Sequence, residues 1–314
     1  MAHKPGLVPL RPLSVGDILQ ATFTAVFRRP LLYFGLAAVV AAVGVILGAL
    51  VVGLLYLIGE LDEVSSWVGS VGAIVITLAM PPTLMVLNGI VAHPVTEDAL
   101  GVPPTASGTW RFVRPVLVRL FGGTALLTFC YLLLLAPGIV VLAIGAGTVP
   151  VLPLAALAIA ALLVPIAWFA VRSSVMLPAL AVERLGVVAA LGRSFALTRG
   201  MFWRFLAALI VLGLITAVVQ QVLGGLAILL PATGAVGDAI GYLLTPVIAL
   251  VTQPFIAVLH AVLYLDTRIR HEAYDVVLSE AAARLGGGYA AAPQFFSPGA
   301  DGRGAPPPGP WMSP

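Results

Sequence analysis

Six stretches of the sequence are apolar over about 20 residues or more, the length that an α-helix needs to cross the hydrocarbon core of a membrane. The first carries no charged residue, and the third carries only Arg119, close to its start. A water-soluble fold carries roughly 25% charged residues, whereas this chain has 9%. We therefore predict an all-α, polytopic membrane protein with about six transmembrane helices, over Leu31–Ile58, Trp67–Ala92, Val116–Ala146, Pro150–Val171, Phe205–Leu230 and Ala239–Leu265.

The distribution of charge predicts how these helices are oriented. The charged residues in the three loops on one side are all acidic, whereas all 16 Lys and Arg residues fall on the other side. Because basic residues accumulate on the cytoplasmic side of a membrane, this split predicts that both termini are cytoplasmic. The acidic residues of the outer loops are Glu60, Asp62, Glu63 and Asp238.

A short amphipathic helix is predicted in front of the first span. Ser14 can cap it while Asp17 reaches back, and apolar residues then recur at three- and four-residue steps as far as Arg28. Similar segments, Ser107–Arg114 and Gly186–Arg199, precede the third and fifth spans. Such helices typically lie in the plane of the membrane interface, although binding to a protein partner is an alternative.

The three short helices are part of a threefold pattern. The pairs Arg29-Pro30, Arg114-Pro115 and Arg199-Gly200 recur every 85 residues, each at the start of a span. We predict a membrane domain over 14–268, built from three tandem units of an interfacial amphipathic helix plus a helical hairpin: 14–98, 99–183 and 184–268. A cytoplasmic helix is expected over 269–285, with a disordered N-terminus over 1–13 and a disordered Gly- and Pro-rich tail over 286–314.

This pattern also bears on mechanism. Each unit contains two spans, so all three units cross the membrane in the same direction, which disfavours an inverted-repeat transporter. A parallel-repeat transporter or channel stays open.

Few polar residues interrupt the spans. Asn88, Arg172 and His260 lie near the cytoplasmic end of the second helix of each unit, where they define a candidate inner-leaflet polar site. For Arg172 the alternative is a side chain that extends to the interface or pairs with a neighbour. Asn88 and His260 can instead satisfy interior hydrogen bonds. Candidate contacts for anionic lipid are Arg28, Arg29, Arg114, Arg199 and Arg204.

The sequence contains no motif that predicts catalysis. There is one cysteine, Cys130, and the four histidines are scattered without metal-ligand spacing. We find no phosphate-binding glycine loop and no nucleophile–base set. We therefore expect no enzyme activity, no cofactor, no metal and no nucleic-acid partner.

Three stretches together resemble one bacterial membrane family. They are Arg11–Leu19, then Pro178–Gly186 with Ala190–Arg204, and finally Tyr264–Glu272. The family is named for the membrane domain of glycerophosphoryl diester phosphodiesterase, and the resemblance covers about residues 10–280. In that enzyme the chemistry belongs to a separate soluble barrel, which needs some 200 residues or more. The resemblance therefore implies the membrane part without the catalytic barrel, and it assigns no functional residue.

These observations together predict a non-catalytic module of the bacterial cytoplasmic membrane. Its partners would be the bilayer, with anionic lipids of the inner leaflet, and a membrane or cytoplasmic protein of unknown identity. The alternative function is a parallel-repeat transporter or channel, with a polar cavity open to the cytoplasm near Asn88, Arg172 and His260.

Overall fold

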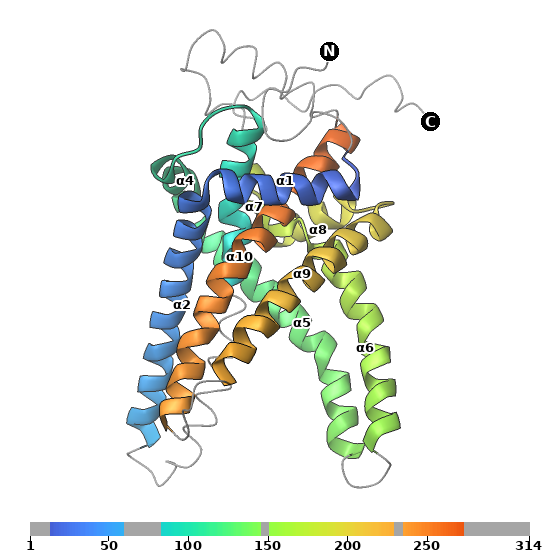
Figure 1. Cartoon of the computed structure of the whole chain (residues 1–314). Helices are drawn as coiled ribbons and strands as arrows, with labels where there is room; N and C mark the ends of the chain where they lie inside the picture. The colour runs from blue at the N-terminus through green and yellow to red at the C-terminus, as the bar shows by residue number, and fades with distance from the viewer. Residues whose placement is uncertain (1–12, 60–82, 146–150, 229–234, 273–314) are drawn as a thin grey trace.

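The computed structural model describes residues 13–59, 83–145, 151–228 and 235–272. No strand occurs among them, and nearly all of them are helical. A helix covers residues 83–99, and η1 (Arg114–Val116) is a 3-10 turn. The other helices are α1 (Val15–Arg28), α2 (Pro30–Gly59), α4 (Ala106–Val113), α5 (Leu117–Gly145), α6 (Val151–Ser173), α7 (Met176–Glu183), α8 (Val187–Leu197), α9 (Phe202–Ile228) and α10 (Ala235–Glu272) (Figure 1).

Five segments of the described chain are long and apolar enough to cross a membrane. They confirm the all-helical class and agree with a chain that crosses the membrane several times. The predicted span Trp67–Ala92 lies largely outside the described residues. So do the predicted N-terminal segment up to residue 12, the tail 286–314 and the predicted cytoplasmic helix beyond residue 272. The five segments are Pro30–Val51, Ala106–Gly138, Leu162–Glu183, Phe202–Gly225 and Val247–Glu272.

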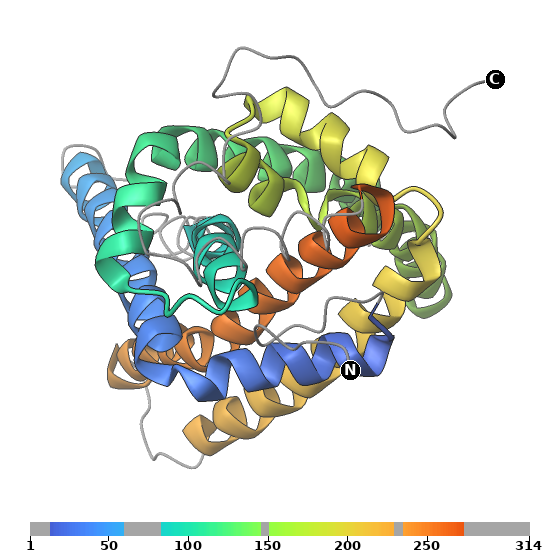
Figure 2. The same ribbon diagram turned by 90° about the horizontal axis from the view of Figure 1, so that it is seen from above.

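Three short amphipathic helices, α1, α4 and α8, form what we call the collar. The predicted start of α1 is confirmed: the Asp17 amide donates to Ser14 Oγ at 3.1 Å and the Ser14 amide donates to Asp17 Oδ2 at 3.0 Å. Thr105 caps α4 by accepting from the amide of Gly108 at 3.1 Å. The collar lies at one end of the bundle, around the helix over 83–99, as the view from above shows (Figure 2).

The long helices differ in how deeply they are buried. In an apolar 18-residue window of the segments Leu162–Glu183 and Val247–Glu272, 50% and 56% of the residues are buried, against 17–28% in the corresponding windows of the other three candidate spans. Most residues of the helix over 83–99 are also buried. The parts of the returning helices near the collar, α7 and the second half of α10, therefore form the centre with the helix over 83–99, while α2, α5 and α9 turn apolar side chains such as Leu54, Leu133 and Leu214 outward.

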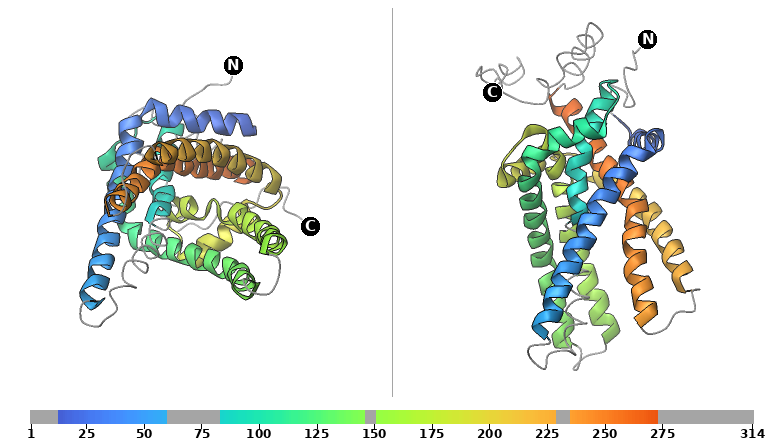
Figure 3. Two further views of the ribbon diagram at one scale, coloured as in Figure 1. Left: turned by 60° about the horizontal axis from the view of Figure 1, so that its bottom comes forward. Right: turned by 90° about the vertical axis from the view of Figure 1, so that its left-hand side faces the viewer.

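The long helices divide into two groups away from the collar. Helices α2, α9 and α10 lie together on one side, and the α5–α6 hairpin lies on the other (Figures 1 and 3). Near the collar, the helix over 83–99 packs against the α5–α6 side of the molecule. It crosses α7 closely at Gly89. A Cβ atom on Gly89 would lie 3.2 Å from the Leu177 carbonyl oxygen and 2.3 Å from Leu120 Cδ2. A side chain at residue 89 would displace the end of Leu120 and press against the backbone of α7.

We predict that Gly89→Ala lowers the free energy of unfolding by about 1–3 kcal/mol, since the backbone of α7 cannot move away without disturbing the core. Gly35→Ala is the matched control, because a Cβ there meets nothing within 4 Å. The control should leave stability unchanged or slightly raised. Thermal unfolding of both variants in detergent measures the difference, and equal melting temperatures would contradict the close crossing.

Candidate functional site

A buried carboxylate, Asp266 of α10, ties the start of the collar to the centre of the bundle. Asp266 is 0% exposed. Its Oδ1 accepts from the Leu13 amide at 2.9 Å, and its Oδ2 pairs with Arg204 of α9 at 3.2 Å and Arg270 at 3.1 Å. Arg270 also donates to the Leu13 carbonyl at 2.9 Å. We call these four residues the Asp266 cluster. Its two arginines and the amide offset the cost of removing a carboxylate from water.

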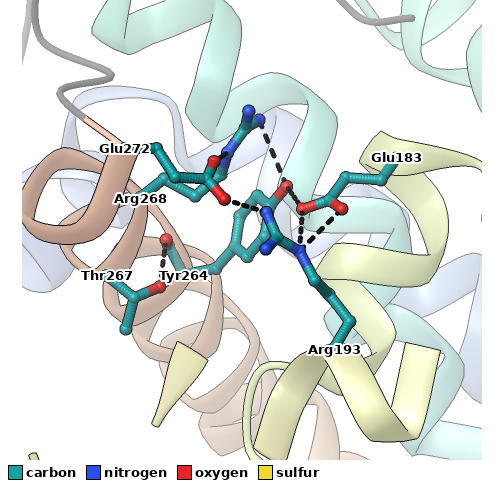
Figure 4. A network of polar contacts seen from close by, with 6 residues as sticks. All are labelled: Glu183, Arg193, Tyr264, Thr267, Arg268 and Glu272. Carbon is teal, nitrogen blue, oxygen red and sulfur yellow. Dashed lines mark hydrogen bonds and ion pairs between the residues drawn. The ribbon is translucent and has the colours of Figure 1, made fainter. Parts of the chain in front are cut away.

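A second set of paired charges connects α7 and α8 with α10 (Figure 4). Arg193 of α8 donates from Nε to Glu183 of α7 at 2.9 Å, and its Nη2 contacts Glu272 at the end of α10. Tyr264 donates to Glu183 Oε1 at 2.9 Å, and Arg268 donates to Glu272 Oε2 at 2.8 Å. We call these five residues the Glu183 cluster.

The pKa of Arg193 reflects the same pairing. Burial alone would lower this pKa, but the hydrogen bonds from Arg193 to Glu183 and Glu272 outweigh burial and raise it. Arg193 therefore stays charged, and the Glu183 cluster acts as an electrostatic connection between the collar and α10.

A third set lies where α1 turns into α2. Arg29 Nε approaches Asp98 Oδ1 at 3.7 Å, and His93 Nδ1 lies 3.5 Å from Glu97 Oε2. We call these four residues the Asp98 cluster. Burial raises the pKa of Asp98 while Arg29 opposes the shift, and burial raises the pKa of Glu97 from 4.5 to about 7. Each of the three clusters thus joins a collar helix, or the chain directly next to one, to a returning helix.

The three residues of the predicted polar site, Asn88, Arg172 and His260, each have different surroundings. Arg172 donates from Nη1 to the Phe195 carbonyl of α8 at 3.1 Å, and its guanidinium lies 5.9 Å from the centre of the Trp168 ring. His260 Nδ1 contacts the Ile256 carbonyl of its own helix at 2.7 Å. Asn88 is buried, and its Oδ1 has no hydrogen-bond partner among the described residues. Among these residues, no hydrogen bond joins any two of the three predicted side chains.

The candidate lipid contacts separate into two groups. Arg28, Arg114 and Arg199 are exposed at the collar. Arg29 and Arg204 instead face carboxylates, in the Asp98 and Asp266 clusters. Large apolar side chains flank the exposed arginines: Phe27 is 67%, Trp110 57% and Trp203 78% exposed. Aromatic rings beside arginines are typical of the boundary between lipid headgroups and acyl chains.

Sequence reasoning missed the clusters because their members lie far apart in the chain. Glu183 and Tyr264 are 81 residues apart, and Leu13 and Asp266 are 253 apart. One signal was available: the three stretches that carry the family resemblance contain Leu13, Glu183, Arg193, Arg204 and Asp266. In the described chain, no group of three or more His, Cys, Asp or Glu side chains is placed to hold a metal ion.

Comparisons of the chain with protein-family models, with curated proteins and with solved structures found no match. The resemblance to the phosphodiesterase membrane domain therefore stays a prediction based on the three stretches.

The raised pKa of Glu97 predicts a pH dependence of stability. Folded Glu97 keeps its proton up to about pH 7, whereas the unfolded chain releases it near pH 4.5. The stability that this proton contributes is fully present below pH 4.5 and is lost as the pH rises through about 7. Glu97→Gln mimics the protonated side chain and removes this dependence.

Melting temperatures of the wild type and of Glu97→Gln, measured in detergent across this pH range, provide the test. The wild type should become less stable relative to the variant as the pH rises. His93 and Asp98 titrate in both proteins, so the comparison isolates Glu97. A difference that stays constant with pH would contradict a buried, protonated Glu97.

Proposed function

We propose that the protein is a non-catalytic module of the bacterial cytoplasmic membrane whose collar binds anionic phospholipids of the inner leaflet. One observation carries this proposal: the carboxylates next to the collar, Asp98, Glu183 and Asp266, are paired with other arginines, while Arg28, Arg114 and Arg199 are exposed beside apolar side chains. An exposed surface of this kind attracts negative charge. Basic residues near an anionic leaflet contribute about 1 kcal/mol each.

The proposed architecture is three tandem units, 14–98, 99–183 and 184–268, within a protein of about six spans. Several boundaries support it. The collar helices end at Arg28, Val113 and Leu197, which are 85 and 84 residues apart. The outgoing helices α2, α5 and α9 begin at Pro30, Leu117 and Phe202, which are 87 and 85 residues apart.

We place the collar and both termini on the cytoplasmic side. This orientation rests on the sequence prediction that all 16 basic residues fall on one side of the spans. The family resemblance supports the membrane module without the barrel that carries the phosphodiesterase chemistry. A protein partner that recognises the exposed face of the collar is compatible with this arrangement.

A parallel-repeat transporter draws less support from the described residues. That function needs Arg172 to face a polar cavity, but its guanidinium donates to the Phe195 carbonyl and lies against Trp168. His260 satisfies its Nδ1 within its own helix. Both side chains therefore have local contacts that a buried polar group needs.

Lipid affinity tests the proposal. We expect the triple substitution Arg28→Gln, Arg114→Gln, Arg199→Gln to weaken binding of phosphatidylglycerol by about tenfold or more, because each lost charge costs about 1 kcal/mol. Native mass spectrometry of the purified full-length protein with phosphatidylglycerol or phosphatidylethanolamine measures the effect. Lysine at the same three positions is the matched control and should preserve binding. If the glutamine triple variant binds phosphatidylglycerol like the wild type, the proposed function fails.

A further inference from the structure

Two arginines from different parts of the chain meet beside the collar. Arg119, at the start of α5, donates from Nη1 to the carbonyl oxygen of Arg184 at 2.8 Å. Arg184 follows α7, and its guanidinium lies 5.6 Å from the centre of the Phe112 ring of α4. Both arginines are exposed. The Arg119 side chain therefore lies against the backbone of Arg184, while the Arg184 side chain lies against α4, so that α4, α5 and α7 place both exposed arginines on one part of the surface.

The backbone of Arg184 adopts a left-handed conformation. Its φ is 53°, and it is the one described non-glycine residue with a positive φ. Glycine would adopt this conformation without steric cost, whereas a side chain there is strained. The backbone of Arg184 ends α7 and accepts from Arg119, whereas its exposed guanidinium takes part in neither contact.

No carboxylate compensates these charges within the described residues. The ion pairs found there go to other arginines, namely Arg29, Arg193, Arg204, Arg268 and Arg270. Arg111, exposed on α4 next to Phe112, adds a third charge. Exposed positive charges without a carboxylate partner attract anions. Arginines bind phosphate groups through paired N–H donors, as they bind carboxylates.

The next helix adds to the positive field. α8 begins at Val187, two residues after Leu185, and its N-cap Gly186 provides no side-chain hydrogen bond. A Cβ on Gly122 of α5 would lie 3.3 Å from Val187, so the start of α8 lies beside α5. The free amides of a helix start carry a partial positive charge, which strengthens the attraction that the arginines already exert.

Exposed apolar side chains surround this basic surface. Val118 is 85% and Val188 77% exposed, and each lies within four residues of Arg119 or Arg184. A soluble anion gains nothing from these side chains, whereas a phospholipid covers them with its acyl chains while its headgroup meets the arginines. The combination therefore favours a lipid over a free phosphate ion.

We infer that Arg119 and Arg184, with Arg111 at the rim, form a defined binding site for the headgroup phosphate of an anionic phospholipid. This inference rests on the proposed function and deepens it, because it assigns the tightest lipid contact to one place on the collar. The site does not include Arg28, Arg114 or Arg199, so the two proposals can fail separately.

The test is native mass spectrometry of the full-length protein with phosphatidylglycerol. The double variant Arg119→Gln, Arg184→Gly should bind the first phosphatidylglycerol at least about tenfold more weakly than the wild type. Arg184→Gly suits a φ of 53° and should not lower stability. Arg119→Lys with Arg184→Lys keeps both charges and should retain most of the binding. If the double variant does not fold, Arg119→Gln alone carries the same test.

Comparison with variants elsewhere on the collar distinguishes failure of the site from failure of the proposed function. The double variant Arg28→Gln, Arg199→Gln removes the same charge elsewhere on the collar and should affect the first bound lipid less. If Arg28→Gln, Arg199→Gln weakens binding of the first lipid as much or more, the site is overturned and the proposed function stands. The same conclusion follows if Arg119→Gln, Arg184→Gly has no effect on lipid binding while the triple variant at 28, 114 and 199 does. If no variant changes binding, both fail.

A competition experiment separates lipid from soluble anion. Inorganic phosphate, added in large excess over phosphatidylglycerol, should leave the first lipid bound to the wild type. If inorganic phosphate displaces it, and if phosphate binding depends on Arg119 and Arg184, the site serves a soluble anion and the lipid assignment is wrong.

Discussion

Three carboxylates at the ends of buried, returning helices determine how the rest of the molecule is held together. Asp98, Glu183 and Asp266 lie where the apolar centre meets the collar, and each is bound by an arginine from another element. A carboxylate removed from water without a partner costs several kcal/mol, so these pairs fix the relative positions of the elements that supply them. Asp266 is the most constrained of the three, because it also accepts from the Leu13 amide and so attaches the chain in front of α1 to α10.

The internal pairing also determines what the collar can present to its surroundings. Arginines that neutralise the buried carboxylates are occupied, and those that remain exposed lie beside Phe27, Trp110, Trp203 and other apolar side chains. Such a surface is typical of the place where water, charged headgroups and hydrocarbon meet, which is the boundary of a membrane. The outgoing helices α2, α5 and α9 continue from this boundary with apolar, outward-facing side chains. The fold therefore combines a charge-paired centre with a basic and apolar outer face, and the proposed lipid binding rests on the outer face.

Local patterns in the sequence predicted most of the helices, while the clusters depended on the fold. The capping pair Ser14 and Asp17 and the uncharged run from Leu31 are properties of neighbouring residues, and the structure agrees with both. Asn88, Arg172 and His260 were selected because they are polar within apolar segments, a criterion that ignores what each side chain touches. The Glu183–Arg193 ion pair could have been predicted, since the two residues are only ten positions apart in the stretch that carries the family resemblance. The contacts of Tyr264 and Glu272 with that pair depend on how α10 crosses α7 and α8, which no local pattern encodes.

A double-mutant cycle on Glu183 and Arg193 tests most directly whether charge pairing holds the collar to the centre. Equilibrium unfolding in mixed micelles would be measured for Arg193→Gln, Glu183→Gln and the double variant, with Arg199→Gln, an exposed arginine two residues beyond α8, as the control. We predict that Arg193→Gln costs about 2 kcal/mol because Glu183 loses its partner, and that the double variant recovers much of this loss, with a coupling energy of about 2 kcal/mol. The control should stay within about 0.5 kcal/mol of the wild type. Additive single substitutions, or a control as damaging as Arg193→Gln, would contradict the account.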